Sequence, residues 1–373
     1  LELLKAKAES DADTVAASVT VAVPIKGVSF VDVDGASLSN SSAAAEATAT
    51  GLEGGGGDDT IMREGDLIKL EADSDADSLA VSVTIAGTVG GDAKGLALSE
   101  ASATAEATAA GISGGDGDDT LENRATIDAT STSVSEANSV SADVSVQVAG
   151  GGDCTGAALS DSSATSNATA TGIDGGEGSD EIDNEGDIVT LADADADSLA
   201  VSVAIGVGSN GVFGGDLESE AASDASSTAE ATSAGIVAGT GDDTLENSGT
   251  IQADVHSTAT SKSISADVAV QVGANGTSSG AALSDSSATA RATAIGIDGG
   301  VGNDIITNKG DITLMQRDEE WNAHADALAV GVTIGFAGAF SGAAGSAISN
   351  SSAMSDAGAT GIAGGEGDDT IDN

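Results

Sequence analysis

The stretch that decides the fold is residues 191–205, LADADADSLAVSVAI, in which small and larger side chains alternate. Its even positions are all Ala or Ser, and its odd positions are Leu, Asp, Val or Ile. A period of two is typical of a β-strand, because successive side chains of a strand point to opposite faces. A helix would need apolar residues at i, i+3 and i+4, and no such stripe is present. Residues 156–173 alternate in the same way, so each pair of stretches predicts two strands.

These paired stretches recur along the whole chain. A marker glycine returns at Gly51, Gly111, Gly172, Gly235, Gly296 and Gly361, with spacings of 60, 61, 63, 61 and 65 residues and a mean of 62. The spacing predicts one continuous array of six units, with approximate bounds 1–62, 63–122, 123–183, 184–246, 247–307 and 308–373. Because the chain starts and stops inside a unit, we expect it to be a window from a longer array.

Stacking the units in register predicts an all-β, repetitive β-solenoid similar to a parallel β-helix. We expect the Ala/Ser/Gly faces to pack together inside it, since only small faces fit against each other. Equivalent residues then form ladders at about 4.8 Å. Candidate ladders are Thr48, Thr108, Thr169, Thr232 and Thr293, and Asn123, Asn184, Asn247 and Asn308. One unit could form a single broad coil with two long strands or about three shorter coils, and the sequence leaves both open.

Composition excludes several function classes. The chain has 11 Lys and Arg against 61 Asp and Glu, a formal charge of −50, and it has four Phe, one Trp and no Tyr. Such a polyanion repels nucleic acid, so we expect no nucleic-acid partner. No apolar run is long enough to cross a bilayer, which predicts no membrane span. Nothing in the repeats resembles a catalytic segment, so we expect no enzyme activity.

Each unit carries one glycine-aspartate loop, as in Gly175-Gly176-Glu177-Gly178-Ser179-Asp180-Glu181-Ile182-Asp183. Five copies match Gly-Gly-x-Gly-x-Asp-x-U-x, where U is a large apolar residue, and the fourth has Ala238 at the first glycine. This pattern resembles the calcium-binding nonapeptide of repeats-in-toxin (RTX) proteins. The nonapeptides of that family run in tandem, whereas here they lie a whole unit apart. The half-sites therefore meet only if successive units stack in register, and the alternative is a solvated hairpin turn.

The resemblance implies Ca²⁺ as the bound ion, held by loop carboxylates and carbonyls. The carboxylate ligands would be Asp59, Asp119, Asp180, Asp243, Asp304 and Asp369, with Asp58, Asp118, Asp242 and Asp368 as further candidates. The carbonyl ligands would be those of Gly55, Gly57, Gly115, Gly117, Gly176, Gly178, Gly239, Gly241, Gly300, Gly302, Gly365 and Gly367. Asn-x-Gly-x-Ile segments such as residues 184–188 resemble bends of bacterial filamentous adhesins and autotransporter β-helices.

Branched apolar residues share the outer face with the Asp residues. We expect five triplets in register: Val81, Val83, Ile85; Val144, Val146, Val148; Val201, Val203, Ile205; Val268, Val270, Val272; and Val330, Val332, Ile334. An outward stripe of this kind needs a cover, which predicts lateral or end-to-end self-association, above all through the first and third triplets. If the stripe lies inside instead, a monomeric rod is allowed.

Together these features predict a structural component of a calcium-stabilised bacterial fibre, biofilm matrix or surface layer outside the cell. The alternative is a rigid calcium-dependent stalk of a giant adhesin. A further alternative is ice binding through the Thr ladder.

Overall fold

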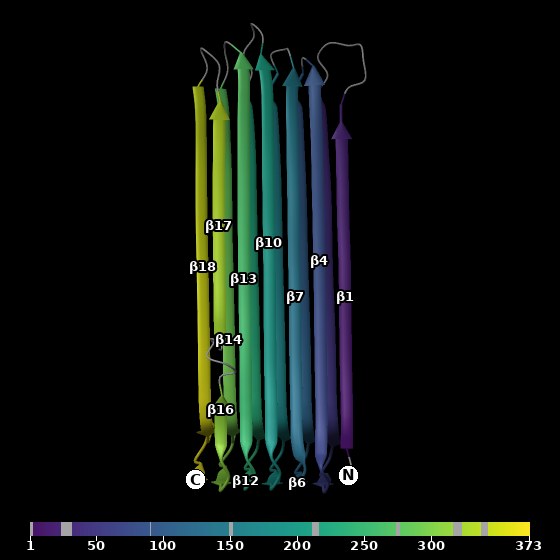
Figure 1. Ribbon diagram of the computed structural model, residues 1–373, viewed down its shortest axis with the longest axis vertical. Helices are drawn as coiled ribbons and strands as arrows, with labels where there is room; N and C mark the ends of the chain where they lie inside the picture. The colour runs from purple at the N-terminus through teal and green to yellow at the C-terminus, as the bar shows by residue number, and fades with distance from the viewer. Residues whose placement is uncertain are drawn as a thin grey trace.

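The computed structural model is an all-β solenoid built from parallel strands (Figure 1). It describes residues 3–23, 32–89, 91–148, 152–210, 216–273, 277–315, 323–336 and 342–373. Within these ranges every regular element is a strand, which confirms the predicted fold class. Both ends of the chain lie at the same end of the long strands (Figure 1).

The strands form three parallel sheets. Sheet A contains β1 (Leu3–Ala22), β4 (Leu67–Val89), β7 (Thr126–Val148), β10 (Ile188–Asn210), β13 (Ile251–Gly273), β16 (Ile312–Met315) and β17 (Ala323–Phe336). Sheet B contains β2 (Val33–Gly56), β5 (Ala93–Asp116), β8 (Cys154–Glu177), β11 (Leu217–Thr240), β14 (Thr277–Asp298) and β18 (Gly342–Ala363). Sheet C contains β3 (Thr60–Arg63), β6 (Thr120–Asn123), β9 (Glu181–Asn184), β12 (Thr244–Asn247), β15 (Ile305–Asn308) and β19 (Thr370–Asp372).

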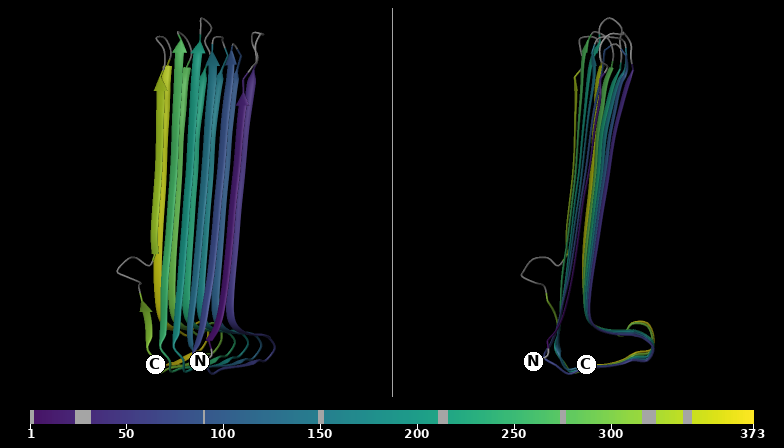
Figure 2. Two further views of the ribbon diagram at one scale, coloured as in Figure 1. Left: turned by 45° about the vertical axis from the view of Figure 1, so that its right-hand side comes forward. Right: turned by 90° about the vertical axis from the view of Figure 1, so that its right-hand side faces the viewer.

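One unit of sequence makes one broad coil. The chain follows a long strand of sheet A, returns along a long strand of sheet B, and passes through a short strand of sheet C before the next coil begins. The long strands of the second to fifth coils have 22 to 24 residues. The structure therefore selects the single broad coil over three shorter ones. We call sheets A and B together the blade, and sheet C with its adjoining bends the base (Figure 2).

The blade packs small side chains against small side chains. Ala192, Ala194, Ala196 and their equivalents on both sheets are buried, as the alternating pattern predicts. Many inner Ser hydroxyls donate a hydrogen bond to a backbone carbonyl of the facing sheet, for example Ser131 Oγ to the Ala107 carbonyl at 2.8 Å. A short hydroxyl can reach the facing backbone only when two sheets lie close together. The blade interior therefore combines a dry Ala face with cross-sheet hydrogen bonds.

The base has a conventional branched core. Its buried side chains come from sheet C and from the adjoining ends of the strands of sheets A and B. They form three ladders: Ile112, Ile173, Ile236 and Ile297; Leu121, Ile182, Leu245 and Ile306; and Ile68, Ile127, Ile188 and Ile251. Burying a branched side chain stabilises a fold by about 1.5–3 kcal/mol, more than an Ala methyl provides. The base is therefore where the apolar burial per residue is greatest.

A buried amide ladder runs through the base and confirms the predicted Asn alignment. Asn123 Nδ2 donates to Asn184 Oδ1 at 2.8 Å, and Asn184 Nδ2 donates to Asn247 Oδ1 at 2.7 Å. The ladder continues through Asn308 to Asn373. Asn184 Nδ2 also donates to the carbonyl of Gly186, two residues on, which fixes the bend.

The branched apolar residues of sheet A lie on its outer face, but their register differs from the predicted one. Val81 pairs with Val140, and Ile85 pairs with Val144 rather than with a residue four positions later. The side chain of Val148 lies outside the described residues. We call the resulting rows the stripe: Val81, Val140, Val201, Ile264, Val330; Val83, Ala142, Val203, Ala266, Val332; Ile85, Val144, Ile205, Val268, Ile334; and Val146, Val207, Val270, Phe336.

Candidate metal centre

The six glycine-aspartate loops stack directly on one another at the base. Gly115 pairs with Gly176, and Gly176 pairs with Gly239. The glycines at the second and fourth positions of each loop motif have positive φ, such as 106° at Gly176 and 126° at Gly178. A Cβ at Gly176 would lie 2.0 Å from the carbonyl oxygen of Gly115 in the preceding coil. Glycine is thus required here both for the turn and for the close stacking of coils.

In-register stacking places the motif Asp residues in a continuous ladder. One carboxylate oxygen of each accepts a hydrogen bond from the backbone N–H of the motif Asp in the preceding coil. The N–H donors and Oδ1 acceptors are Asp59 to Asp119 at 2.7 Å, Asp119 to Asp180 at 2.8 Å, Asp180 to Asp243 at 2.7 Å, Asp243 to Asp304 at 2.9 Å, and Asp304 to Asp369 at 3.0 Å. The half-sites that the sequence separates by a whole unit therefore meet in the fold.

The second oxygen of these carboxylates has no hydrogen-bond partner. Oδ2 is buried and unpartnered in Asp59, Asp119, Asp180, Asp243 and Asp304. It points at the first glycine of its own loop, since a Cβ at Gly175 would lie 2.7 Å from Asp180 Oδ2. Burial raises the pKa of Asp243 to about 6, and it also raises the pKa of Asp180 and Asp304. A buried carboxylate oxygen without a donor is unfavourable unless a proton or a cation reaches it.

The donor set of this ladder fits a hard cation. It offers carboxylate and carbonyl oxygens, the ligands that Ca²⁺ takes. Each of the four inner loops supplies one buried motif carboxylate, and the described residues bring no three His, Cys, Asp or Glu side chains together as a metal-binding group. An ion would therefore need ligands from adjacent coils and from the backbone. The Gly239 and Gly300 carbonyls already accept hydrogen bonds from the N–H groups of Val301 and Glu366, at 2.9 and 2.8 Å.

The other four acidic candidates of the loops lie in a different environment. Asp58, Asp118, Asp242 and Asp368 are exposed. The side chains of Asp58, Asp118 and Asp242 accept hydrogen bonds from the following coil, as when Ser179 N–H donates to Asp118 Oδ1 at 2.8 Å. Ser179 and Asn303 occupy the same position in two coils, and Asn303 also donates to Asp242. This outer row therefore links successive loops through hydrogen bonds whether the position holds Asp, Ser or Asn.

Sequence reasoning missed two buried carboxylates in the blade. Asp143 and Asp267 lie on the inner face, not on the outer face with the other Asp residues of sheet A. They face glycines of sheet B, because a Cβ at Gly95 would lie 2.0 Å from Asp143 Oδ1, and one at Gly280 would clash with Asp267. Burial raises the pKa of Asp143 to about 7 and that of Asp267 to about 6. Counting alternate positions from Ile127 or Ile251 would have placed both residues inside.

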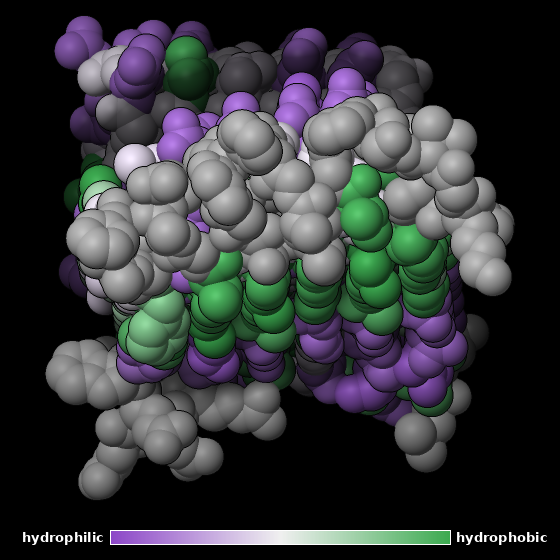
Figure 3. Space-filling view, turned by 90° about the horizontal axis from the view of Figure 1, so that it is seen from above, coloured by the Kyte–Doolittle hydropathy of each residue, from purple (hydrophilic) through white to green (hydrophobic). Residues whose placement is uncertain are grey.

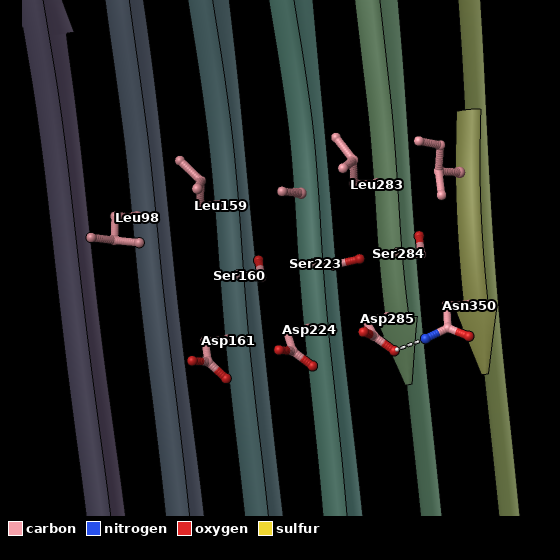
Figure 4. Close-up of a pocket in the computed structure, with 12 residues that line it drawn as sticks. Leu98, Leu159, Ser160, Asp161, Ser223, Asp224, Leu283, Ser284, Asp285 and Asn350 are labelled. Atoms are coloured by element: carbon pink, nitrogen blue, oxygen red, sulfur yellow. Dashed lines mark hydrogen bonds between the residues drawn. The ribbon is translucent and has the colours of Figure 1, made fainter. Parts of the chain in front are cut away.

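A shallow groove crosses the outer face of sheet B (Figure 4). Ala222 is shorter than Leu159 and Leu283 on either side of it, which makes the hollow. The row below the Leu side chains is acidic, with Asp161, Asp224 and Asp285 in register, and Asn350 Nδ2 donates to Asp285 Oδ1 at 3.2 Å (Figure 4). No His, Cys or Lys is among the lining residues.

The predicted Thr ladder is confirmed on the outer face of the same sheet. Thr48, Thr108, Thr169, Thr232 and Thr293 pair in register. The neighbouring row toward the base is mixed, with Thr50, Ala110, Thr171, Ala234, Ile295 and Thr360. Two adjacent regular Thr rows, which an ice-matching surface needs, are therefore not formed there.

No protein-family model, no curated protein and no solved structure matches this chain. A search for helices with the length and apolarity of a bilayer span finds none in the described part of the chain.

Proposed function

We propose that this chain is a structural component of a calcium-stabilised bacterial fibre, biofilm matrix or surface layer outside the cell, without catalytic activity. The observation that carries the proposal is the ladder of six motif carboxylates, five of which have a buried oxygen with no partner. The similarity of the loops to RTX nonapeptides supports Ca²⁺ as the ion. The in-register stack supports it further, because it brings the separated half-sites together.

The ion would be held by motif carboxylates of adjacent coils, such as Asp119, Asp180 and Asp243, together with loop carbonyls. When bound, Ca²⁺ would neutralise the carboxylates and join one coil to the next. Without a cation, carboxylates stacked at about 4.8 Å repel one another across a poorly solvated site. The net charge of −50 adds to this repulsion along the whole stack. Bound calcium would thus stiffen the solenoid at the base, where the motif carboxylates repel one another.

The repetition of the same strands and the same apolar surface from coil to coil also supports a structural role. The same kinds of strand return from coil to coil at nearly equal spacing, and the groove on sheet B lies on an open outer face. The stripe faces outward from a single chain and gives each coil an apolar contact surface. We propose that copies associate through it.

Thermal unfolding in Ca²⁺ and in EDTA tests the calcium proposal. An ion present at one hundred times its dissociation constant stabilises the folded state by about 2.7 kcal/mol per site, so Ca²⁺ should raise the midpoint strongly. Asp180→Asn should lose part of that increase, because the amide cannot replace the anionic ligand. In EDTA the same variant should be at least as stable as the original chain, since it removes a buried charge.

Asp161→Asn is the matched control, because it removes the same charge from the exposed outer row of sheet B. It should leave the Ca²⁺-dependent increase intact. A midpoint that is the same in Ca²⁺ and in EDTA would contradict the proposal. Terbium luminescence and titration calorimetry on the original chain and on both variants give an independent measure of ion binding.

A further inference from the structure

The stripe forms a flat apolar surface near the loop end of sheet A, opposite the base. Figure 3 looks along the strands from that end and shows apolar residues as a band on one side, with hydrophilic residues beyond it. Several of its side chains are exposed to solvent, including Ile85 at 37% and Val332 at 46%. Four rows at about 6.6 Å and five coils at about 4.8 Å give roughly 630 Å². Soluble monomers rarely leave so large a patch uncovered.

The charge on the same face is unevenly distributed. Between the stripe and the base, three rows of sheet A are rich in carboxylates and carry Thr, Val or His at their other positions: Glu9, Asp73, Asp193; Asp11, Asp75, Asp195; and Asp13, Asp77, Glu136, Asp197, Asp326. Lys7 near the edge already pairs with Glu9, Glu71 and Asp73. The face is therefore apolar toward the loop end and strongly acidic toward the base.

This distribution decides how two copies can meet. With strands parallel across the interface, stripe would cover stripe, but the acidic rows would also face each other. With strands antiparallel, stripe covers stripe while each acidic half projects beyond the loop end of the other copy. Like charges face to face cost several kcal/mol, so the antiparallel arrangement is strongly favoured.

We infer that the partner of the stripe is a second copy of this chain, paired about a two-fold axis parallel to the direction of coil stacking. The two blades join at their loop ends and the two bases lie far apart. The pair buries roughly 1,300 Å² in total, within the range of stable protein interfaces. Every added coil extends both stripes equally, so the pairing suits an array of any length. The inference rests on the self-association part of the proposed function and not on Ca²⁺.

Sedimentation velocity in Ca²⁺ tests the partner. The original chain should be a dimer, and Val203→Asp should be a monomer, because it places a charge in the centre of the stripe. Thr169→Asp, which adds the same charge on the outer face of sheet B, should remain a dimer. The increase in the unfolding midpoint on adding Ca²⁺ should be unchanged in both variants, which separates a failure of pairing from a failure of the calcium proposal.

A spin label tests the geometry without disturbing the stripe. Cys154 is buried, and burial raises its thiol pKa to about 12, so Thr132→Cys supplies the reactive site. Antiparallel pairing places the two labels about 70 Å apart, whereas parallel pairing places them at about 15 Å. A short distance overturns the inference. So does an original chain that stays monomeric in Ca²⁺, including one that adsorbs to phosphatidylcholine vesicles instead.

Discussion

The base and the blade belong to the same coils, yet they are stabilised differently. The base repeats the same buried residue in nearly every coil, as in the Ile ladders, the Asn ladder and the motif Asp ladder. The inner face of the blade varies from coil to coil. One inward position carries Ala72, Ser131, Ala192 and Val255 in four successive coils.

The difference shows which region sets the register. A slip by two residues keeps each side chain on its own face of the sheet. In the base it would leave buried amides and carboxylates without partners, at about 1–3 kcal/mol for each group. In the blade it would mainly exchange Ala for Ser on the inner face. The base therefore specifies how coils align, and the blade follows the alignment. Substitutions in the two regions should differ accordingly.

Asn184→Ala in the base should have the largest effect. It leaves Asn123 Nδ2, Asn247 Oδ1 and the Gly186 carbonyl without their partner. Three unpaired buried groups predict a loss of about 3–6 kcal/mol in the free energy of unfolding. Urea unfolding followed by circular dichroism measures it. Asn167→Ala on the outer face of sheet B is the control, and equal losses for the two would refute the role of the base.

Asp143→Thr should stabilise the blade, and the gain should depend on pH. Thr84 occupies the same position in the preceding coil and donates to the Leu96 carbonyl at 2.7 Å. The folded-state pKa of Asp143 is about 7, above the ordinary value near 4, so its stability contribution is complete below pH 4 and is lost by about pH 7. At pH 8 the variant should be more stable by about 4 kcal/mol, and the gain should shrink toward pH 4.

These measurements should be made in EDTA, because protons would compete with Ca²⁺ at the proposed site in the base and would give the base the opposite pH dependence. The nearby Cys154 stays protonated throughout, since burial raises its pKa to about 12. Unfolding of both chains from pH 4 to 8 gives the difference. A gain that is the same at every pH would show that the carboxylate is not what destabilises the blade.

Ser131→Ala should have the smallest effect. It removes one cross-sheet hydrogen bond to the Ala107 carbonyl, and such bonds contribute about 1 kcal/mol. Adjacent coils already carry Ala72 and Ala192 at this position, so the packing accepts the change. The unfolding free energy should fall by about 1 kcal/mol or less. A loss as large as that of Asn184→Ala would mean that the blade also depends on polar ladders.

Much of the fold could be predicted because repetition marks equivalent positions. The unit length, the inward small face and the Thr and Asn ladders all follow from counting. The register of the stripe did not, because the sequence analysis aligned the Val-rich triplets with one another. Counting from Ile127 and Ile188 at the base places Val140 beside Val201, as the structure does.

Some features of the candidate site could likewise be predicted from the sequence, and others could not. Its ligand residues follow from a local motif, so the Asp ladder could be predicted once in-register stacking was assumed. The unpartnered state of Asp180 Oδ2 depends on how tightly the coils approach at Gly175, which no pattern reveals. The buried position of Asp143 depends on the facing Gly95 and Gly156, which lie on other strands.

The broad coil sets how far this chain can reach. Each turn of the solenoid uses a mean of 62 residues. Each turn advances the stack by only about 4.8 Å, whereas one residue of an extended strand advances by about 3.3 Å. A spacer built this way would need on the order of a thousand residues to cross 80 Å. The same turn adds two strips of outer face, each as long as a strand of more than 20 residues. The architecture therefore favours covering an area over bridging a distance, which suits a layer or a sheath better than a stalk.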